Sequence, residues 1–88
     1  MPKLHFTETY RKHFSKLPTQ IKKKAKKALR LLEKNPAHPS LRSKPVESAH
    51  GIFEASVDLK YRLTYERLPG DVLRLRVIGK HNETLRNP

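Results

Sequence analysis

His81 is the residue with the clearest potential for chemistry, because it closes the stretch Gly79-Lys80-His81 after an alternating run of apolar and basic residues. An imidazole titrates at about pH 6.5 in model peptides, so it can accept or donate a proton near neutrality. Arg62, in the preceding run, carries a planar guanidinium whose donors match the oxygens of a phosphate. A proton-transfer group beside an anion-binding group is the pairing needed for chemistry at a phosphodiester.

More cations follow the same alternation. Lys60 and Arg62 are two residues apart on one predicted strand, and Arg74 and Arg76 are two residues apart on the next. Because side chains two positions apart on a strand share a face, these cations should line one face of a sheet. Such a face, with an imidazole where the last strand ends, is typical of a polyanion-binding surface.

Three alternating runs, at 51–57, 61–66 and 72–78, predict the strands that would carry these groups. The turn at 68–71 places Pro69 and Gly70 at the central positions of a type II turn. The opposite, buried face would hold Phe53, Ala55, Val57, Tyr61, Leu63, Tyr65, Leu73, Leu75 and Val77. The alternation does not decide where the ring of Tyr61 lies. It belongs either to the core or to the cleft, where it would be a stacking platform.

The first half of the chain predicts one short strand and two helices. Residues 4–6 form the strand, and Thr7 can cap a helix whose Tyr10, Phe14 and Leu17 recur at helical spacing. A second helix begins near Pro18 and runs to about Lys34, and a surface loop covers 37–49. We therefore expect an α+β domain over residues 1–88 with the order β-α-α-β-β-β. The two-helix hairpin would pack on one face of a four-stranded, mainly antiparallel sheet.

Composition narrows the function classes. The 88 residues carry a formal net charge of +12 and no cysteine, which excludes a disulfide framework and a thiolate site. A strongly basic small domain favours nucleic acid or an acidic protein as the partner. Without an apolar run of about 20 residues or a signal peptide, we expect a cytoplasmic protein that does not span a membrane. No spacing of histidines and acids suits a metal, so neither metal nor cofactor is expected.

His50, where the loop enters the second predicted strand, is a second candidate for proton transfer. His5 and His13, in the first strand and the first helix, are expected to lie away from the site, and His38 is expected to be a solvated loop residue, with a position over the site as the alternative. In total, the candidate catalytic residues are His81, Arg62 and His50. The candidate RNA-binding residues are Lys60, Tyr61, Arg74, Arg76, Arg42, Lys44 and Lys80.

The sequence resembles the RelE/ParE toxin superfamily of type II toxin–antitoxin pairs over essentially its whole length. The resemblance is carried by the element order, by Gly51-Ile52-Phe53-Glu54-Ala55, by Lys60-Tyr61-Arg62-Leu63-Thr64-Tyr65 and by Gly79-Lys80-His81-Asn82-Glu83. The loop 38–44 adds to it. The Gly-x-His ending is most similar to the YafQ-like subgroup.

This resemblance implies an endoribonuclease that cleaves mRNA, with the ribosome as a partner and an acidic antitoxin as its inhibitor in a toxin–antitoxin hetero-oligomer. It places Arg62 at a phosphate-binding position and His81 at a catalytic position. Two alternatives stay open at this point. One is a non-catalytic, ParE-like toxin that binds gyrase, and the other is a plain RNA-binding module.

Overall fold

A mixed five-stranded sheet forms the centre of the molecule, with the strands in the order β1-β5-β4-β3-β2. The computed structural model describes all 88 residues of the chain. β1 pairs in parallel with β5, and the other neighbouring pairs are antiparallel. The strands are β1 (Lys3–Phe6), β2 (Lys44–Pro45), β3 (Ile52–Ser56), β4 (Tyr61–Leu68) and β5 (Val72–Lys80). The α+β class predicted from the sequence is confirmed, and the six predicted elements occur in the predicted order, with β2 and the C-terminal helix α3 (His81–Arg86) in addition.

The sheet has one strand more than the four that alternation predicts. The additional strand, β2, is two residues long, and its Lys44 and Pro45 pair with Glu54 and Phe53 of β3. A two-residue segment that includes a proline has no alternation to detect, which is why it was expected to be loop.

Two helices follow β1, as expected. α1 (Glu8–Ser15) is capped by Thr7, whose hydroxyl accepts a hydrogen bond of 3.1 Å from the N–H of Tyr10. α2 (Thr19–Lys34) starts after Pro18 and ends at Asn35, the residue before Pro36. A short 3-10 helix, η1 (Pro39–Leu41), then leads into β2.

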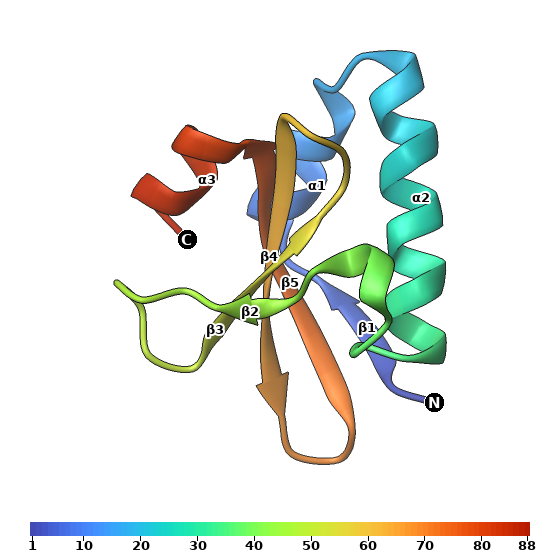
Figure 1. Ribbon diagram of the computed structural model, residues 1–88, viewed down its shortest axis with the longest axis vertical. Coiled ribbons are helices and arrows are strands. Elements are labelled where there is room, and N and C mark those ends of the chain that lie inside the picture. Colours follow the sequence, from blue (N-terminus) through green and yellow to red (C-terminus); the bar gives the residue numbers. More distant parts are fainter.

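The main core lies between the sheet and the pair α1 and α2, which cover one face of the sheet (Figure 1). Side chains from both helices, from η1 and from three strands meet there. The core consists of Tyr10, Ala25, Ala28, Leu32, Leu41, Ala55, Leu63, Tyr65, Leu73, Leu75 and Ile78. Tyr65 is completely buried and stacks on Phe53 with ring centroids 5.7 Å apart.

β5 contains an irregularity that the sequence did not predict. Thr64 pairs with Val77, but the next β4 residue, Tyr65, pairs with Leu75, so Arg76 is an extra residue in β5. Beyond Arg76 the inside and outside positions are exchanged. Ile78 therefore joins the core that was expected to contain Val77, and Val77 lies beside Thr64 on the other face.

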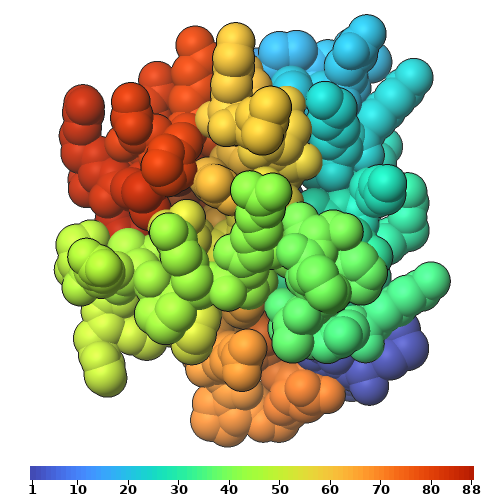
Figure 2. All heavy atoms as spheres, viewed as in Figure 1, coloured from blue at the N-terminus to red at the C-terminus, as the bar shows by residue number.

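The face of the sheet opposite α1 and α2 was expected to be open, and in the structure it is partly covered. The third helix, α3 (His81–Arg86), lies on this face, against β4 and β5 (Figure 1). Residues after α3 also reach the sheet, because the carbonyl oxygen of Pro88 accepts a hydrogen bond of 3.1 Å from the hydroxyl of Thr64. At the other end of the hairpin the β4–β5 turn (orange) projects from the molecule in Figure 2.

Candidate functional site

His81 lies at the end of the β4–β5 hairpin, where β5 passes into α3. Tyr61 pairs with Lys80, and the backbone N–H of His81 donates a hydrogen bond of 2.8 Å to the carbonyl oxygen of Lys60. His81 and Lys60 are therefore neighbours across the hairpin, joined through their backbones. His81 is half-buried and Lys60 is exposed.

The turn that presents Lys60 is ordered by Asp58. One carboxylate oxygen of Asp58 accepts hydrogen bonds of 2.8 Å from the N–H groups of both Lys60 and Tyr61. The ammonium of Lys24 on α2 lies 3.6 Å from the other oxygen. Burial by itself would raise the pKa of Asp58, but the two N–H donors and Lys24 outweigh it and lower that pKa. The carboxylate therefore stays ionised and holds the Lys60 backbone in place.

Arg62 lies one position into β4, opposite Gly79 of β5 and Ser56 of β3. Its neighbour on the same face is Glu54, whose oxygen Oε1 lies 3.9 Å from Nε of Arg62. The exposed fractions of the two side chains are 18% for Arg62 and 4% for Glu54. Neither of these two atoms has a hydrogen-bond partner. Arg62 thus belongs to the sheet face that was expected to be cationic, but it is accompanied there by a buried acid.

Arg74 and Arg76, two other cations of the predicted face, are engaged by Glu66. Its oxygen Oε1 accepts a hydrogen bond of 2.8 Å from Nε of Arg74 and one of 2.6 Å from an NH2 group of Arg76. Nε of Arg76 also donates to the carbonyl oxygen of Pro88 at 3.0 Å. The hydrogen bond from Arg74 is the main cause that lowers the pKa of Glu66, and Arg76 adds to it against the effect of burial.

His50 is not brought together with His81. It is exposed and lies in the turn before Ile52, and Ile52 pairs with Glu66 near the far end of β4. His81 adjoins the near end of β4, where Tyr61 pairs with Lys80. The two histidines therefore lie toward opposite ends of the strand.

The two basic residues of the loop are exposed. Arg42 ends η1 in a left-handed conformation with φ of 47°, and Lys44 lies in β2 opposite Glu54. They sit on the β2 side of the sheet, and β3 separates them from β4.

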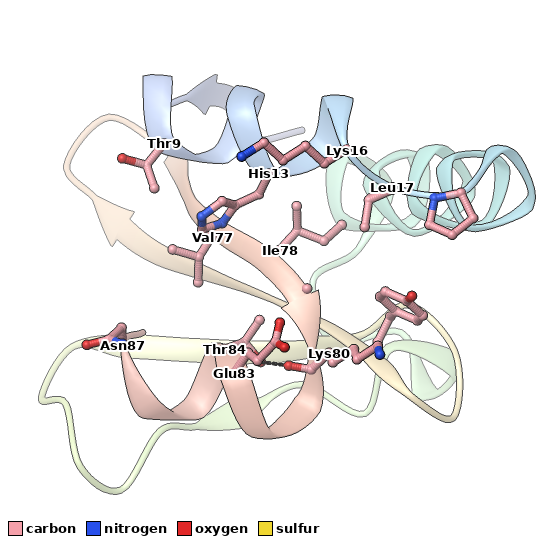
Figure 3. A pocket seen from close by; sticks show the side chains of 13 residues that line it. Thr9, His13, Lys16, Leu17, Val77, Ile78, Lys80, Glu83, Thr84 and Asn87 are labelled. Carbon is pink, nitrogen blue, oxygen red and sulfur yellow. Dashed lines mark hydrogen bonds between the residues drawn. The ribbon is translucent and has the colours of Figure 1, made fainter.

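A cleft of about 590 Å³ runs along the free edge of β5, between α1 and α3. β1 pairs with β5 only as far as Leu75, which leaves the last residues of β5 without a strand on that side. Figure 3 shows Thr9 and His13 projecting from α1 on one side and Glu83 and Thr84 from α3 on the other, across Val77 and Ile78 of β5.

Two residues of this cleft bear on the expectations from sequence. Tyr61 lines it and is half-buried, so the structure places its ring at the cleft rather than deep in the core. His13 lines it too, and its buried Nδ1 has no hydrogen-bond partner. His13 was expected to lie away from the site, and that expectation was wrong, because the direction in which α1 crosses β5 is set by tertiary packing.

No group of three or more His, Cys, Asp or Glu side chains is arranged to hold a metal ion. None of the helices has both the length and the hydrophobicity to cross a bilayer.

Known structures share this fold. No protein-family model and no curated protein sequence matches the chain. The crystal structure of YafQ from E. coli strain BL21(DE3) is 21% identical, with a TM-score of 0.77 over 96% of this chain and 98% of that one. A YoeB/ParE toxin from Agrobacterium tumefaciens is 15% identical, with a TM-score of 0.76 over 90% and 98%. A chain of the intact E. coli RelBE toxin–antitoxin complex is 22% identical, with a TM-score of 0.72 over 91% and 96%.

These likenesses establish the fold. The chain has the architecture of the RelE-like and YafQ-like toxins, as the resemblance of its sequence implied.

Proposed function

We propose that this protein is the toxin of a type II toxin–antitoxin pair and an endoribonuclease that cleaves mRNA in association with the ribosome. The observation that carries the proposal is that the backbone positions of Lys60, Arg62 and His81 lie at the same end of the β4–β5 hairpin. The fold, shared with toxins, and the net charge of +12 support it.

The proposed reaction is an internal transfer at the phosphodiester. The 2′-oxygen attacks phosphorus, the bond from phosphorus to the 5′-oxygen breaks, and a 2′,3′-cyclic phosphate and a 5′-hydroxyl are formed. His81 accepts the proton of the 2′-hydroxyl, and Arg62 and Lys60 neutralise the charge that develops on the phosphate. Because His50 lies toward the other end of β4, the leaving 5′-oxygen takes its proton from water.

RNA is held in this proposal mainly by groups near His81. Lys60 and Lys80 are exposed cations at the end of the hairpin, and the ring of Tyr61 offers a stacking surface. Arg74 and Arg76 contribute less, because Glu66 neutralises part of their charge and Glu66 and Pro88 already occupy some of their donors. Arg42 and Lys44 are exposed on the β2 side and attract RNA at longer range.

The proposed protein partner is an acidic antitoxin that forms a hetero-oligomer with this chain. A basic domain with a net charge of +12 attracts an acidic segment that competes with RNA for the same cations. The structural likeness to a chain of the RelBE toxin–antitoxin complex supports this partner.

A second candidate is a non-catalytic toxin of the ParE type. The observation that favours it is the separation of His50 from His81, which leaves a single imidazole near Arg62. Such a toxin would arrest growth by binding its target without cutting RNA.

Induced expression, followed by growth measurement and mapping of transcript 5′ ends, separates these functions. The nuclease predicts arrest with new 5′ ends inside coding regions, both abolished by His81→Gln or Arg62→Ala. His5→Gln, at an exposed position in β1, is the matched control and stays toxic. Arrest without new ends indicates the non-catalytic toxin. Full toxicity of both site variants rejects the assigned site.

A further inference from the structure

Glu54 is an unusual residue for the centre of β3. Its side chain is 4% exposed, it pairs across the sheet with Thr64, and it faces the side of the sheet that carries Arg62. Its oxygen Oε1 is buried and accepts no hydrogen bond. A buried ionised carboxylate costs free energy unless it is paired and hydrogen-bonded, so its presence calls for a physical reason.

Arg62 is the charged partner of this carboxylate, and the two groups lie close together without a hydrogen bond between these atoms. Nε of Arg62 lies 3.9 Å from Oε1 of Glu54, which is longer than an N–H···O hydrogen bond of about 2.7–3.2 Å. Nε of Arg62 is also buried without a partner. For stability alone, a well-packed apolar pair would serve at least as well as such an ion pair.

Glu66 on the same face shows what a structural pair looks like in this protein. Its Oε1 accepts hydrogen bonds of 2.8 Å and 2.6 Å from Arg74 and Arg76. Glu66 is therefore fully paired with its arginines, whereas Glu54 and Arg62 lie close together without a hydrogen bond between them.

We infer that Glu54 is a positioning residue that holds the guanidinium of Arg62 ready to bind an RNA phosphate. A guanidinium carries five N–H donors in a planar fork. The carboxylate lies nearest to Nε, at 3.9 Å, and no hydrogen bond within the protein occupies the terminal NH2 groups, so their donors remain available to a ligand. The inference rests on the proposed function, since it takes a phosphodiester as the ligand of Arg62.

The charge of Glu54 also prevents Arg62 from being an isolated buried cation. Without it, the guanidinium would turn toward water and lose its fixed orientation. A displacement of about 1 Å in a positioning group can lower a rate about 100-fold. We therefore expect a loss of between about 10-fold and 100-fold in the rate of cleavage on removal of the charge.

A double-mutant cycle tests this inference. The four proteins are the wild type, Glu54→Gln, Arg62→Gln and the double variant, assayed by cleavage of a short mRNA on programmed ribosomes. Glu54→Gln keeps the size of the side chain and removes its charge. We expect it to lower the rate in the Arg62 protein and to have no effect in the Arg62→Gln protein, because it acts through Arg62. Glu47→Gln, at an exposed position, is the matched control and keeps the wild-type rate.

Each other outcome overturns the inference. A wild-type rate for Glu54→Gln shows that the carboxylate positions nothing. An equal loss in both Arg62 backgrounds shows a structural role only. If Glu54→Gln fails to fold, as judged by circular dichroism, Glu54→Asp replaces it and retracts the charge by one methylene. The same coupling to Arg62 is then expected, and its absence overturns the inference.

Failure of the proposed function is distinguishable from failure of this inference. If the wild type does not cleave RNA, the nuclease proposal is rejected. The same four proteins are then compared by fluorescence anisotropy with a labelled single-stranded oligoribonucleotide. Weaker binding on Glu54→Gln in the Arg62 background alone supports the positioning role without catalysis. Equal binding by all four proteins, or no binding by the wild type, rejects it.

Discussion

The N–H of His81 donates a hydrogen bond of 2.8 Å to the carbonyl oxygen of Lys60, so the backbone rather than the imidazole fixes the position of His81. The bond joins the start of α3 to the turn before β4. Since it involves no side-chain atom of either residue, a substitution of the imidazole leaves it in place.

His81→Gln should therefore separate activity from stability. We expect the midpoint of urea unfolding to stay within error of the wild type. The rate of RNA cleavage should fall by about 10²–10⁴-fold, the usual contribution of a general acid or base. A large shift in the unfolding midpoint would show instead that the imidazole has a structural role.

Glu66→Gln should destabilise the protein in a pH-dependent way. The pKa of Glu66 is lowered in the folded state from its ordinary value of 4.5 by Arg74 and Arg76. A carboxylate with a lowered folded pKa contributes stability that is complete above its unfolded pKa and is lost as the pH falls through its folded pKa. The variant should be less stable by about 1 kcal/mol at pH 7.

Urea unfolding of wild type and Glu66→Gln at pH 7 and at pH 3 measures this difference. The gap between the two proteins should shrink as the pH falls below 4.5. A gap that is the same at both pH values would mean that the carboxylate is not the source of the stability.

Thr7→Ala should cost about 1–2 kcal/mol of stability. The hydroxyl of Thr7 accepts from the N–H of Tyr10 and donates to the carbonyl oxygens of Leu75 and Arg76, at 2.8 Å and 3.1 Å. It thus caps α1 and ties that helix to β5. Thermal unfolding of Thr7→Ala and of Thr7→Ser checks this, since serine keeps the hydroxyl and should retain most of the stability.

Tyr61→Ala should weaken binding of single-stranded RNA by about 1–3 kcal/mol, the usual value of one base stacked on an aromatic ring. The ring is half-buried at the cleft between α1 and α3. Tyr61→Phe keeps the ring and should bind like the wild type in a fluorescence anisotropy titration. Equal binding by all three proteins would remove Tyr61 from the RNA site.

Much of the fold follows from local signals in the sequence. Alternation predicts β3, β4 and β5, and the hydroxyl of Thr7 with the prolines at 18 and 36 marks the helix boundaries. These features depend on neighbours along the chain, and such neighbours are visible in a sequence.

The features that could not be predicted from the sequence depend on residues that are far apart in the chain and are brought together or kept apart by the fold. The pairing of Glu66 with Arg74 and Arg76 requires the register of the hairpin. The position of His13 in the cleft requires the angle at which α1 crosses β5. The separation of His50 from His81 requires knowing which end of β4 each histidine adjoins.

Because Arg76 is an extra residue in β5, the side chains that face the helices are odd-numbered before it and even-numbered after it. Up to Leu75, odd-numbered side chains point to α1 and α2, and from Val77 onward the even-numbered ones do. Gly79 therefore lies on the same side as Arg62, and α3 leaves the strand on the side where it covers Val77. Loss of that one residue would remove the irregularity, because Leu75, Val77 and Ile78 would then alternate against Tyr65, Thr64 and Leu63 with each side chain on its present face. Deleting Arg76 is thus a different event from replacing it, because a replacement removes the ion pair with Glu66 and keeps the extra residue, whereas a deletion removes both and leaves a regular ladder between β4 and β5.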